Sequence, residues 1–393
     1  MPSEKQEPSV VVVGGGVTGT ASAYMLAEDH DVTVVDKGMI AGDTTARASG
    51  FLATPPTFPK MPDMSEYCMS FFREFDGTGI YTFRECPTVH LVDEDEVDTA
   101  ETYAERARAN DRPVTFRTPA EISSTYEKRF DISSCGGALV FENTGYTNPF
   151  DFTVSLKHVA ETRGAKFYTD TTVQDIVTAD GSVLGVQTRH GRIEADYVLV
   201  AAGWRTHDLL ADVVEIPVIP ARWESVILDP VEEVSSTYPM GTDWVEHGIY
   251  WRPTPEGYVL VGGNPIPVDD EEKGERKLSV TDEFLDLVTT EVPGMVRAAG
   301  DARVVRDECC PTGAAGTPDT MPIIDAPADA PDGLVVAAGF QRGGILAAPA
   351  TARTVRSLVT GEEPPFSIAP FRLDRFNESE RSTDFELVSY VTG

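Results

Sequence analysis

One stretch near the start of this 393-residue chain predicts its fold: Val10-Val11-Val12-Val13-Gly14-Gly15-Gly16-Val17-Thr18-Gly19. Four consecutive β-branched residues are typical of a central strand in a parallel sheet, which is covered on both faces. Glycines at 14, 16 and 19 follow at once, and the small side chains of residues 18–28 fit a helix that packs closely on the strand. The pattern predicts the strand, tight turn and helix of a dinucleotide-binding unit.

A second short strand is expected at residues 32–35, and it ends in Asp36, seventeen residues after Gly19. Backbone N–H groups at the glycine turn would hold a pyrophosphate, and the Asp36 carboxylate would accept hydrogen bonds from the adenosine ribose. An acid at this place argues against a 2′-phosphate, and so against NADP, but it fits NAD and FAD equally. The cofactor-binding residues predicted from this unit are Gly14, Gly16, Val17, Thr18, Gly19, Asp36 and Lys37.

The charge balance limits the possible partners. The chain has 32 Lys and Arg against 64 Asp and Glu, a net charge of −32, and only eight of the basic residues are Lys. Such a surface repels nucleic acid and anionic membranes, because both bind proteins through Lys and Arg. We expect instead a protein of a salt-rich, halophilic cytoplasm, where screening at molar ionic strength removes the self-repulsion of the acidic surface.

No targeting or transmembrane segment is expected. Residues 1–9 are polar and lack the features of a signal peptide, and the apolar run Val10–Val13 is far shorter than the ~20 residues of a membrane span. The five cysteines are scattered and odd in number, so neither a disulfide framework nor a metal site is expected. A cytoplasmic location follows from this cysteine usage.

The segment after Asp36 favours FAD. Gly42, Thr45, Arg47 and Gly50 resemble the G-x-x-S-x-R-x-x-G element of the FAD-dependent D-amino-acid oxidase, glycine oxidase and sarcosine oxidase family. In that family the element runs beside the flavin ring. The resemblance therefore implies FAD as the cofactor, with contacts from Thr44, Thr45, Arg47, Ala48, Ser49 and Gly50.

Further elements resemble the same family in the same order. Residues 172–186 resemble a small sheet whose Val backbone contacts adenine, and residues 195–203 resemble the strand that returns to the cofactor. A hairpin at 250–263 and a T-P-D strand at 317–324 follow. The contacts implied by the first two elements are Val173, Ala201, Ala202 and Gly203.

A glycine-rich block at residues 333–344 resembles the C-terminal part of the family. Its glycines are expected to open a helix at residues 345–359, whose N-terminal N–H groups would face the flavin N1–C2=O edge and stabilise negative charge there. The flavin contacts implied for this block are Gly339, Arg342, Gly343, Gly344, Ile345 and Leu346.

The resemblance implies an α/β fold in which two domains are interleaved. One would be a Rossmann-type, glutathione-reductase-like FAD-binding domain, and the other a smaller α+β substrate domain. The expected boundaries are 1–85, 146–215 and 301–393 for the FAD-binding domain, 86–145 and 216–300 for the substrate domain, and 377–393 for an acidic C-terminal tail.

The resemblance also implies the reaction. In the family, a neutral amine gives up a hydride to flavin N5, and water hydrolyses the resulting imine. The chain would act in this way on a small amine or amino acid of the sarcosine, glycine or D-amino-acid type. A substrate carboxylate needs a bidentate Arg and usually a Tyr. The candidate catalytic residues are Tyr250, Arg252, Arg47, Arg306 and Arg342.

The chain departs from the family at places that set the substrate and the electron acceptor. Leu260 replaces a Lys that assists the reaction with oxygen in sarcosine oxidases, Leu346 replaces their carboxylate-binding Lys, and residues 313–316 lack an Arg of glycine oxidase. Oxygen, a quinone or an electron-transfer protein stay open as acceptors, with a dehydrogenase favoured. Covalent attachment of FAD at Cys309 or Cys310 and the oligomeric state also stay open.

Two other functions compete with amine oxidation. A relative that oxidises a 2-hydroxy acid or glycerol phosphate needs a general base for the hydroxyl group, so a histidine near flavin N5 would favour it. A non-catalytic flavoprotein subunit of a larger dehydrogenase would instead bind FAD that no amino or hydroxy acid reduces.

Overall fold

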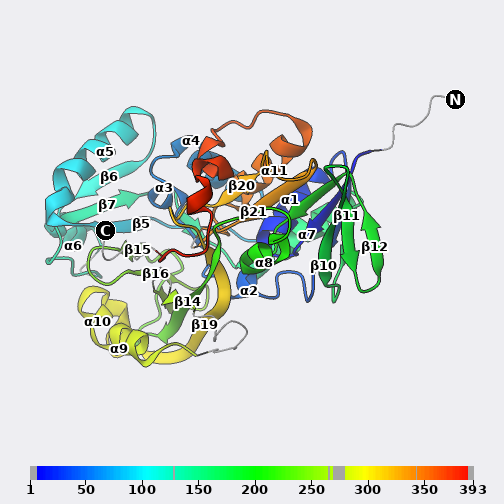
Figure 1. The fold of residues 1–393 in the computed structure, drawn as a ribbon. Coiled ribbons are helices and arrows are strands. Elements are labelled where there is room, and N and C mark those ends of the chain that lie inside the picture. The colour runs from blue at the N-terminus through cyan, green and yellow to red at the C-terminus, as the bar shows by residue number, and fades with distance from the viewer. Residues whose placement is uncertain (1–6, 127–128, 264–265, 269–278, 342, 388–393) are drawn as a thin grey trace.

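The structure, a computed structural model, describes residues 7–126, 129–263, 266–268, 279–341 and 343–387, with the backbone alone at residues 267 and 308–314. It confirms an α/β fold, in which two large sheets and their covering helices form most of the described chain (Figure 1).

The first large sheet contains the valine run of the sequence analysis. Val10, Val11 and Val12 are at most 1% exposed. Their strand is buried because neighbouring strands pair with it on both edges and other elements cover both of its faces. Neighbouring strands are parallel except for the antiparallel edge strand. The strand order is β20 (Ile323–Asp325), β21 (Leu334–Ala338), β13 (Tyr197–Val200), β1 (Ser9–Val13), β2 (Asp31–Val35) and β9 (Lys166–Tyr168).

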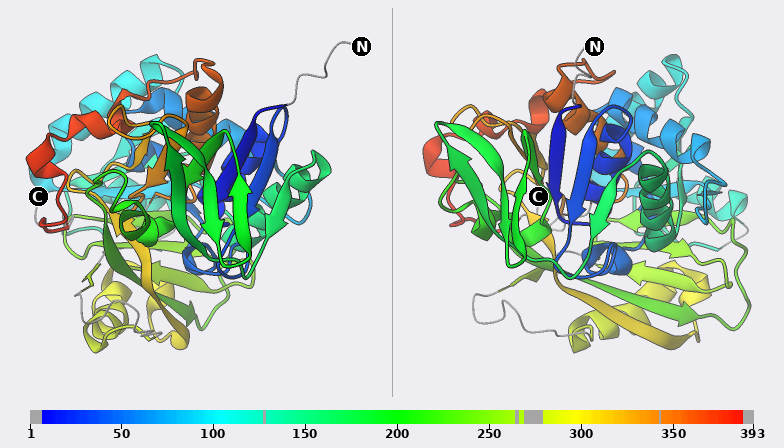
Figure 2. Two further views of the ribbon diagram at one scale, coloured as in Figure 1. Left: turned by 45° about the vertical axis from the view of Figure 1, so that its right-hand side comes forward. Right: turned by 90° about the vertical axis from the view of Figure 1, so that its right-hand side faces the viewer.

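Helices cover one face of this sheet, and a small antiparallel sheet covers the other (Figure 2). The first helix packs so closely on the glycine turn that a β-carbon at Gly19 would come 2.0 Å from the Gly14 carbonyl oxygen. The helical layer consists of α1 (Val17–Leu26), α4 (Pro62–Glu74), α7 (Pro149–Thr162) and α11 (Ala348–Thr360). The opposite layer consists of β10 (Val173–Ala179), β11 (Ser182–Thr188), β12 (Gly191–Glu194) and α8 (Thr206–Leu210).

The helix expected at residues 345–359 begins later than predicted, at Ala348. Residues 344–347 form a turn, and Pro349 falls in the first helical turn. If the helix began at Ile345, Pro349 would have no N–H to donate to the Ile345 carbonyl, and its ring would clash with that group. The proline therefore sets the start of α11.

The second large sheet has nine strands among the described residues. Its two longest strands, β14 (Ile219–Asp229) and β19 (Arg303–Gly316), are antiparallel partners along most of their length. The other strands continue the sheet from β14 in the order β17 (Val259–Gly262), β16 (Ile249–Pro253), β15 (Met240–Asp243), β5 (Thr88–Val92), β7 (Gly137–Phe141) and β6 (Val114–Arg117). The short strand β18 (Ile266–Pro267) pairs with Ala221 and Arg222 of β14, on the edge opposite β19.

Successive side chains along these strands point to opposite faces of the sheet, so one face forms the core of the second sheet and the other is directed at the first sheet. Trp251 is fully buried in the core of the second sheet, while its neighbours Tyr250 and Arg252 lie on the opposite face. Four helices cover this sheet and its edge, namely α5 (Val97–Ala109), α6 (Pro119–Thr125), α9 (Asp282–Thr290) and α10 (Val292–Met295).

The chain passes repeatedly between the two large sheets. A small sheet of β3 (Phe51–Leu52), β8 (Gly145–Tyr146) and β4 (Arg84–Glu85) lies at such crossings. Strand β19 pairs into the second sheet, although the sequence analysis assigns residues from 301 onward to the FAD-binding domain. The domain boundaries themselves stay a prediction. Within the described ranges, no helix has the length and apolar character needed to span a bilayer.

Candidate active site

A cavity of about 560 Å³ is lined by residues from both large sheets. On one side it is bordered by the loops after β1, β2, β13 and β21, and ligands of open parallel sheets bind at such carboxyl ends. On the other side it is bordered by the strands β14, β15 and β16. The predicted site residues that line it are Gly14, Gly16, Val17, Thr18, Asp36, Lys37, Thr44, Thr45, Arg47, Ala48, Ser49, Gly50, Val173, Ala201, Ala202, Gly203, Tyr250, Gly339, Gly344, Ile345 and Leu346.

The glycine turn brings backbone donors to the cavity wall. Gly14 has a φ of +112°, and a β-carbon there would come 2.3 Å from the Ala201 carbonyl oxygen, so only glycine fits. The N–H of Val17, in the first turn of α1, donates to the Thr45 hydroxyl oxygen at 3.0 Å. This places the predicted pyrophosphate end of the cavity between α1 and α2 (Thr44–Arg47).

The carboxylate of Asp36 is held at the end of β2. Its two oxygens accept hydrogen bonds from the backbone N–H groups of Gly15 and Gly38, each at 2.7 Å. A carboxylate has about four acceptor positions, so it can still accept hydrogen bonds from two ribose hydroxyls. Val173 lines the same cavity, as expected for a residue beside adenine.

Three cations gather around one carboxylate in the cavity wall, and we call Lys37, Asp43, Arg47 and Arg205 the Asp43 cluster. Carboxylate oxygens of Asp43 lie 3.5 Å from Lys37 Nζ, 3.8 Å from Arg47 Nη1 and 3.4 Å from Arg205 Nη1. Burial and the charge of Arg205 lower the pKa of Lys37. The cluster has an excess of positive charge, which suits a diphosphate.

These features fit FAD. An acidic strand end for the ribose, backbone donors with a cationic cluster for the diphosphate, and a glycine-rich turn for the flavin all line one cavity. At Gly14 the turn packs so closely on Ala201, at the end of β13, that a β-carbon has no room. When bound, FAD would supply a hydride acceptor at its N5 atom.

The second sheet presents a row of side chains to the cavity, which we call the cross-strand row. Register pairs His90 with Thr242, Thr242 with Tyr250, Tyr250 with Gly262, and Gly262 with Ser225. His90 Nδ1 lies 2.6 Å from the Thr242 hydroxyl oxygen. The Tyr250 ring covers Gly262, where a β-carbon would come 2.2 Å from the Tyr250 hydroxyl oxygen.

Aromatic rings surround Tyr250. The ring of Phe51 lies 5.5 Å away between centroids and that of Trp223 lies 6.4 Å away. Trp244 also lines the cavity. This side of the cavity therefore combines aromatic surface with the hydroxyl groups of the cross-strand row.

Arg252 lies away from the cavity. It is 8% exposed, its Nε donates to the Ser49 carbonyl oxygen, and its Nη1 donates to the Pro253 carbonyl oxygen at 2.7 Å. Its guanidinium carbon lies 5.0 Å from the centroid of the Tyr146 ring. Burial lowers its pKa to about 10. In this position Arg252 holds the cavity-lining loop at Ser49, and its predicted direct contact with a substrate stays a prediction.

Other predicted residues lie outside the cavity wall. Arg306 is exposed on β19, Gly19 packs on the glycine turn, and Gly343 packs near Phe58. Arg342 and the side chains of Cys309 and Cys310 lie outside the described residues.

Sequence reasoning missed several residues that line the cavity. Arg205 follows the Ala-Ala-Gly end of β13 by two residues, which is a signal for a cation beside the cofactor. Trp223 and Ser225 share one face of a strand, but only the pairing of β14 shows which face. The missed residues are Asp43, Trp204, Arg205, Asp208, Trp223, Ser225, Thr242, Trp244 and Gln341.

The chain is similar along most of its length to known flavoproteins. The sequence model of the FAD dependent oxidoreductases (DAO) matches residues 9–358. Glycine oxidase of Geobacillus kaustophilus is 27% identical over 389 residues, which are 93% of this chain and 96% of that protein. The crystal structure of glycine oxidase from Geobacillus kaustophilus, at 25% identity, covers 94% of this chain and 100% of its own, with a TM-score of 0.79.

A second relative is longer than this chain. The 4-methylaminobutanoate oxidase (formaldehyde-forming) of Paenarthrobacter nicotinovorans is 25% identical over 393 residues, which are 95% of this chain and 46% of that protein. The chain thus spans less than half the length of this relative. With its family match, dinucleotide-binding turn and cavity, the chain belongs to the FAD-dependent oxidoreductase family.

Proposed function

We propose that this protein oxidises the C–N bond of a small amine or amino acid, with FAD as the hydride acceptor. The observation that carries the proposal is one cavity that joins the cofactor-binding turns to Tyr250 and its aromatic neighbours. The relatives support the substrate class, because one is called glycine oxidase and the other 4-methylaminobutanoate oxidase.

The chain's own residues would bind and orient the amine. Tyr250 would donate a hydrogen bond from its hydroxyl group to a substrate carboxylate. The rings of Phe51, Trp223 and Trp244 would exclude water from the face where the C–H bond breaks. The amine would lose a hydride and a proton, and water would convert the imine into a carbonyl compound and a free amine.

The electron acceptor is part of the proposal. Leu260 is 6% exposed on β17, and its apolar side chain supplies no positive charge that would assist the reaction of the reduced flavin with oxygen. We favour a dehydrogenase that passes its two electrons to a quinone or an electron-transfer protein. An oxidase would pass them to oxygen and release hydrogen peroxide.

A substrate panel tests the reaction. The protein is purified in high salt, its FAD is identified from the visible spectrum, and amines, amino acids, 2-hydroxy acids and glycerol phosphate are added without oxygen. Reduction of the flavin by amines or amino acids, with release of the carbonyl product, would support the proposal. Peroxide formed in air would assign an oxidase, and its absence with reduction of a quinone would assign a dehydrogenase.

One observation favours a second candidate function. His90 lines the cavity and is hydrogen-bonded to Thr242, so the cavity contains a histidine that would serve as the general base for a hydroxyl group. The alternative is oxidation of a 2-hydroxy acid or glycerol phosphate. Flavin reduction by these compounds, abolished in His90→Gln, would replace the amine proposal with this one.

A further inference from the structure

Arg252 joins two parts of the cavity lining without lining the cavity itself. One part is residues 44–51, which the family resemblance places beside the flavin and which we call the Ser49 segment; the other includes Tyr250 on β16. Arg252 lies two residues after Tyr250 on β16, and its Nε donates to the Ser49 carbonyl oxygen. This contact therefore connects a strand of the second sheet to the segment that contains predicted cofactor-binding residues.

The Arg252 side chain is held at several points. It is 8% exposed, its Nη1 donates to the Pro253 carbonyl oxygen at 2.7 Å, and its guanidinium carbon lies 5.0 Å from the centroid of the Tyr146 ring. Tyr146 is itself fully buried, and its hydroxyl donates to the Ser236 carbonyl oxygen at 3.1 Å. Because the guanidinium group is planar and its donors have fixed directions, these contacts fix the position of the Nε atom that holds Ser49.

Further contacts show what would move if this link were lost. Phe51 pairs in register with Tyr146, and its ring lies 5.5 Å from the Tyr250 ring between centroids. The Phe51 N–H also donates to the Ser49 hydroxyl oxygen at 3.4 Å. Ser49, Phe51 and Tyr250 all line the cavity. A shift of Ser49 relative to Arg252 would thus change the spacing between Tyr250 and the Ser49 segment.

Other hydrogen bonds hold the Ser49 segment to different elements. The Val17 N–H, in α1, donates to the Thr45 hydroxyl oxygen at 3.0 Å, and the Thr147 N–H, just after β8, donates to the Gly50 carbonyl oxygen at 3.0 Å. The bond from Arg252 instead ties the segment to β16. A substitution of Arg252 therefore removes the link to the second sheet and keeps the bonds on the cofactor side.

We propose that Arg252 is a positioning residue, which fixes the spacing between Tyr250 and the Ser49 segment and thereby the rate of hydride transfer. This inference rests on the proposed function and adds a residue that acts without touching the substrate. An error of about 1 Å in the alignment of reacting groups can cost about 100-fold in rate, so a link between the two sides of the cavity matters for catalysis. A direct ligand of the substrate would act differently, because its loss would weaken substrate binding.

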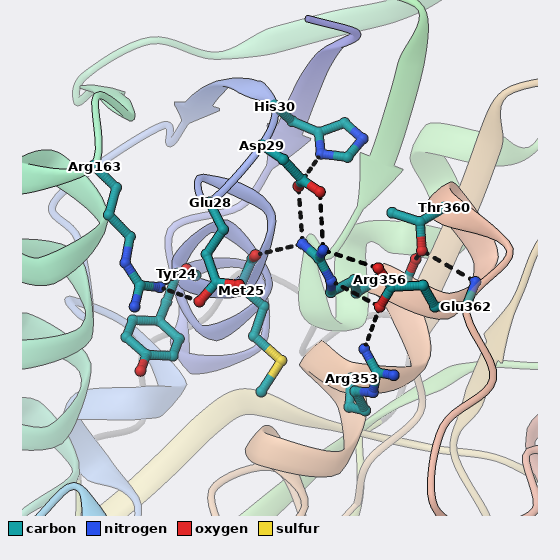
Figure 3. Close-up of polar contacts among 10 residues, drawn as sticks. All are labelled: Tyr24, Met25, Glu28, Asp29, His30, Arg163, Arg353, Arg356, Thr360 and Glu362. Carbon is teal, nitrogen blue, oxygen red and sulfur yellow. Dashed lines mark hydrogen bonds and ion pairs between the residues drawn. The ribbon is translucent and has the colours of Figure 1, made fainter.

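The test compares two variants of Arg252 with a matched control. Arg252→Met keeps the apolar stem and removes all donors, whereas Arg252→Lys keeps the charge and loses the planar fork. The control is Arg163→Met. Arg163 also donates to a backbone carbonyl oxygen, that of Tyr24 at 2.7 Å, and also lies over a tyrosine ring, 4.4 Å from the Tyr24 centroid (Figure 3). It does so between α7 and α1, outside the cavity lining.

The first readout separates the rate from binding in anaerobic flavin reduction by an amine or amino acid. We expect Arg252→Met to lower the limiting rate about 10- to 100-fold and to leave the substrate dissociation constant within about threefold of the parent. Arg252→Lys should stay at least about fivefold below the parent rate, because one ammonium group cannot replace the fork. Arg163→Met should match the parent in both constants, and all variants should keep the FAD content of the parent.

A second readout needs no substrate. Trypsin cleaves after Arg47 in the Ser49 segment, and the Arg47 side chain is 23% exposed, so cleavage requires local opening of the segment. In the FAD-loaded protein we expect cleavage after Arg47 to be about 10-fold faster in Arg252→Met than in the parent or in Arg163→Met. Mass spectrometry of the fragments identifies the cleaved bond.

Three results would overturn the inference. An unchanged limiting rate together with unchanged cleavage after Arg47 in Arg252→Met would show that the link does not position the Ser49 segment. A raised substrate dissociation constant with an unchanged limiting rate would make Arg252 a direct ligand of the substrate. Full recovery of the rate in Arg252→Lys would assign the effect to charge alone.

Failure of the proposed function gives a different result. If no amine or amino acid reduces the flavin of the parent, the proposed oxidation fails, and cleavage after Arg47 alone decides whether Arg252 holds the segment. If Arg252→Met does not fold, Arg252→Lys provides the same test, and parent-like rate and cleavage in that variant would overturn the inference.

Discussion

Two charged clusters of this protein combine cations and carboxylates in different proportions. Near the ends of α1 and α11, Arg356 donates to both oxygens of Asp29, at 2.8 and 2.9 Å, and to Glu362, which also accepts from Arg353 (Figure 3). We call these four residues the Arg356 cluster. Its two cations match its two carboxylates, whereas the Asp43 cluster places three cations around one.

The difference separates stability from ligand binding. The Arg356 cluster joins α11 to the end of α1 within the helical layer of the first sheet. The Arg356 side chain is 11% exposed, while those of Asp29 and Glu362 are 48% exposed. Its charges are satisfied within the protein. The Asp43 cluster places three cations around one carboxylate, and this excess of positive charge suits a bound anion. In a chain with a net charge of −32, this excess marks the cavity as an anion site.

The largest effect is expected at the glycine turn beside the Asp43 cluster. In Gly14→Ala the new methyl group meets the Ala201 carbonyl oxygen, so we expect a loss of more than about 3 kcal/mol in the free energy of unfolding, and no bound FAD. Circular dichroism and the flavin absorbance per protein chain measure both. Gly164→Ala is the matched control, since Gly164 has a φ of +104° but nothing within 4 Å of its β-carbon position, and it should lose only about 1–2 kcal/mol and keep FAD.

Reversing one charge of the Asp43 cluster should affect the ligand and spare the fold. For Arg205→Glu we expect the dissociation constant of FAD to rise roughly 10- to 100-fold, because a carboxylate replaces a cation beside the diphosphate. Arg205→Lys keeps the charge and should stay within about threefold of the parent. Equal FAD affinity in all three proteins, measured by fluorescence titration of the apoprotein, would contradict the assignment of this cluster.

Removing the central cation of the Arg356 cluster should do the reverse. We expect Arg356→Met to lower the free energy of unfolding by about 1–3 kcal/mol, because two half-exposed carboxylates lose their charge-assisted hydrogen bonds. Its affinity for FAD should not change. Arg353→Met removes one partner of Glu362 and should lower the free energy of unfolding less, as measured by thermal denaturation. A drop in FAD affinity in either variant would contradict the distinction between the two clusters.

The smallest expected effect is the pH dependence of the Arg356 cluster. Hydrogen bonds from Arg356 hold the pKa of Asp29 below its ordinary value of 3.8 and that of Glu362 below 4.5. A carboxylate whose pKa is lowered by folding stabilises the protein above its ordinary pKa, and this contribution is lost as the pH falls through the lowered value. The difference in melting temperature between the parent and Arg356→Met should be constant above about pH 5 and should shrink below it. A constant difference down to pH 3 would contradict this.

The sequence predicted the strands at the centre of the first sheet because these depend on local patterns, and most of the predicted cofactor-binding residues line the cavity. Val10–Val13, the glycines and Asp36 lie within one continuous strand-turn-helix-strand segment, so local sequence specifies their positions. Pro349 also indicates the late start of α11 at Ala348, because proline is tolerated in the first turn of a helix, although the helix was predicted to begin at Ile345. Local chemistry therefore sufficed wherever one segment determined the geometry.

The substrate side could not be predicted in the same way. Alternation places Tyr250 and Arg252 on the same face of their strand, but residues two positions apart along a strand are roughly 7 Å apart. Because of this separation, the Arg252 side chain contacts the Ser49 carbonyl and does not line the cavity. The cross-strand row depends on the register of four strand pairs, two of which, β5 with β15 and β14 with β17, join segments that are not adjacent along the chain. The placement of Gln341 depends on a contact with β19 that no local pattern shows. The salt-rich origin inferred from the acidic surface stays a prediction.

In the proposed function, one cavity joins bound FAD to an amine substrate. The most direct measurement is an anaerobic titration of the FAD-loaded protein with glycine, with its N-methyl derivative sarcosine and with the hydroxy analogue glycolate, recorded as the visible absorbance of the flavin. We expect at least one of the two amino acids to reduce the flavin, while glycolate should not. Reduction by glycolate alone would contradict it.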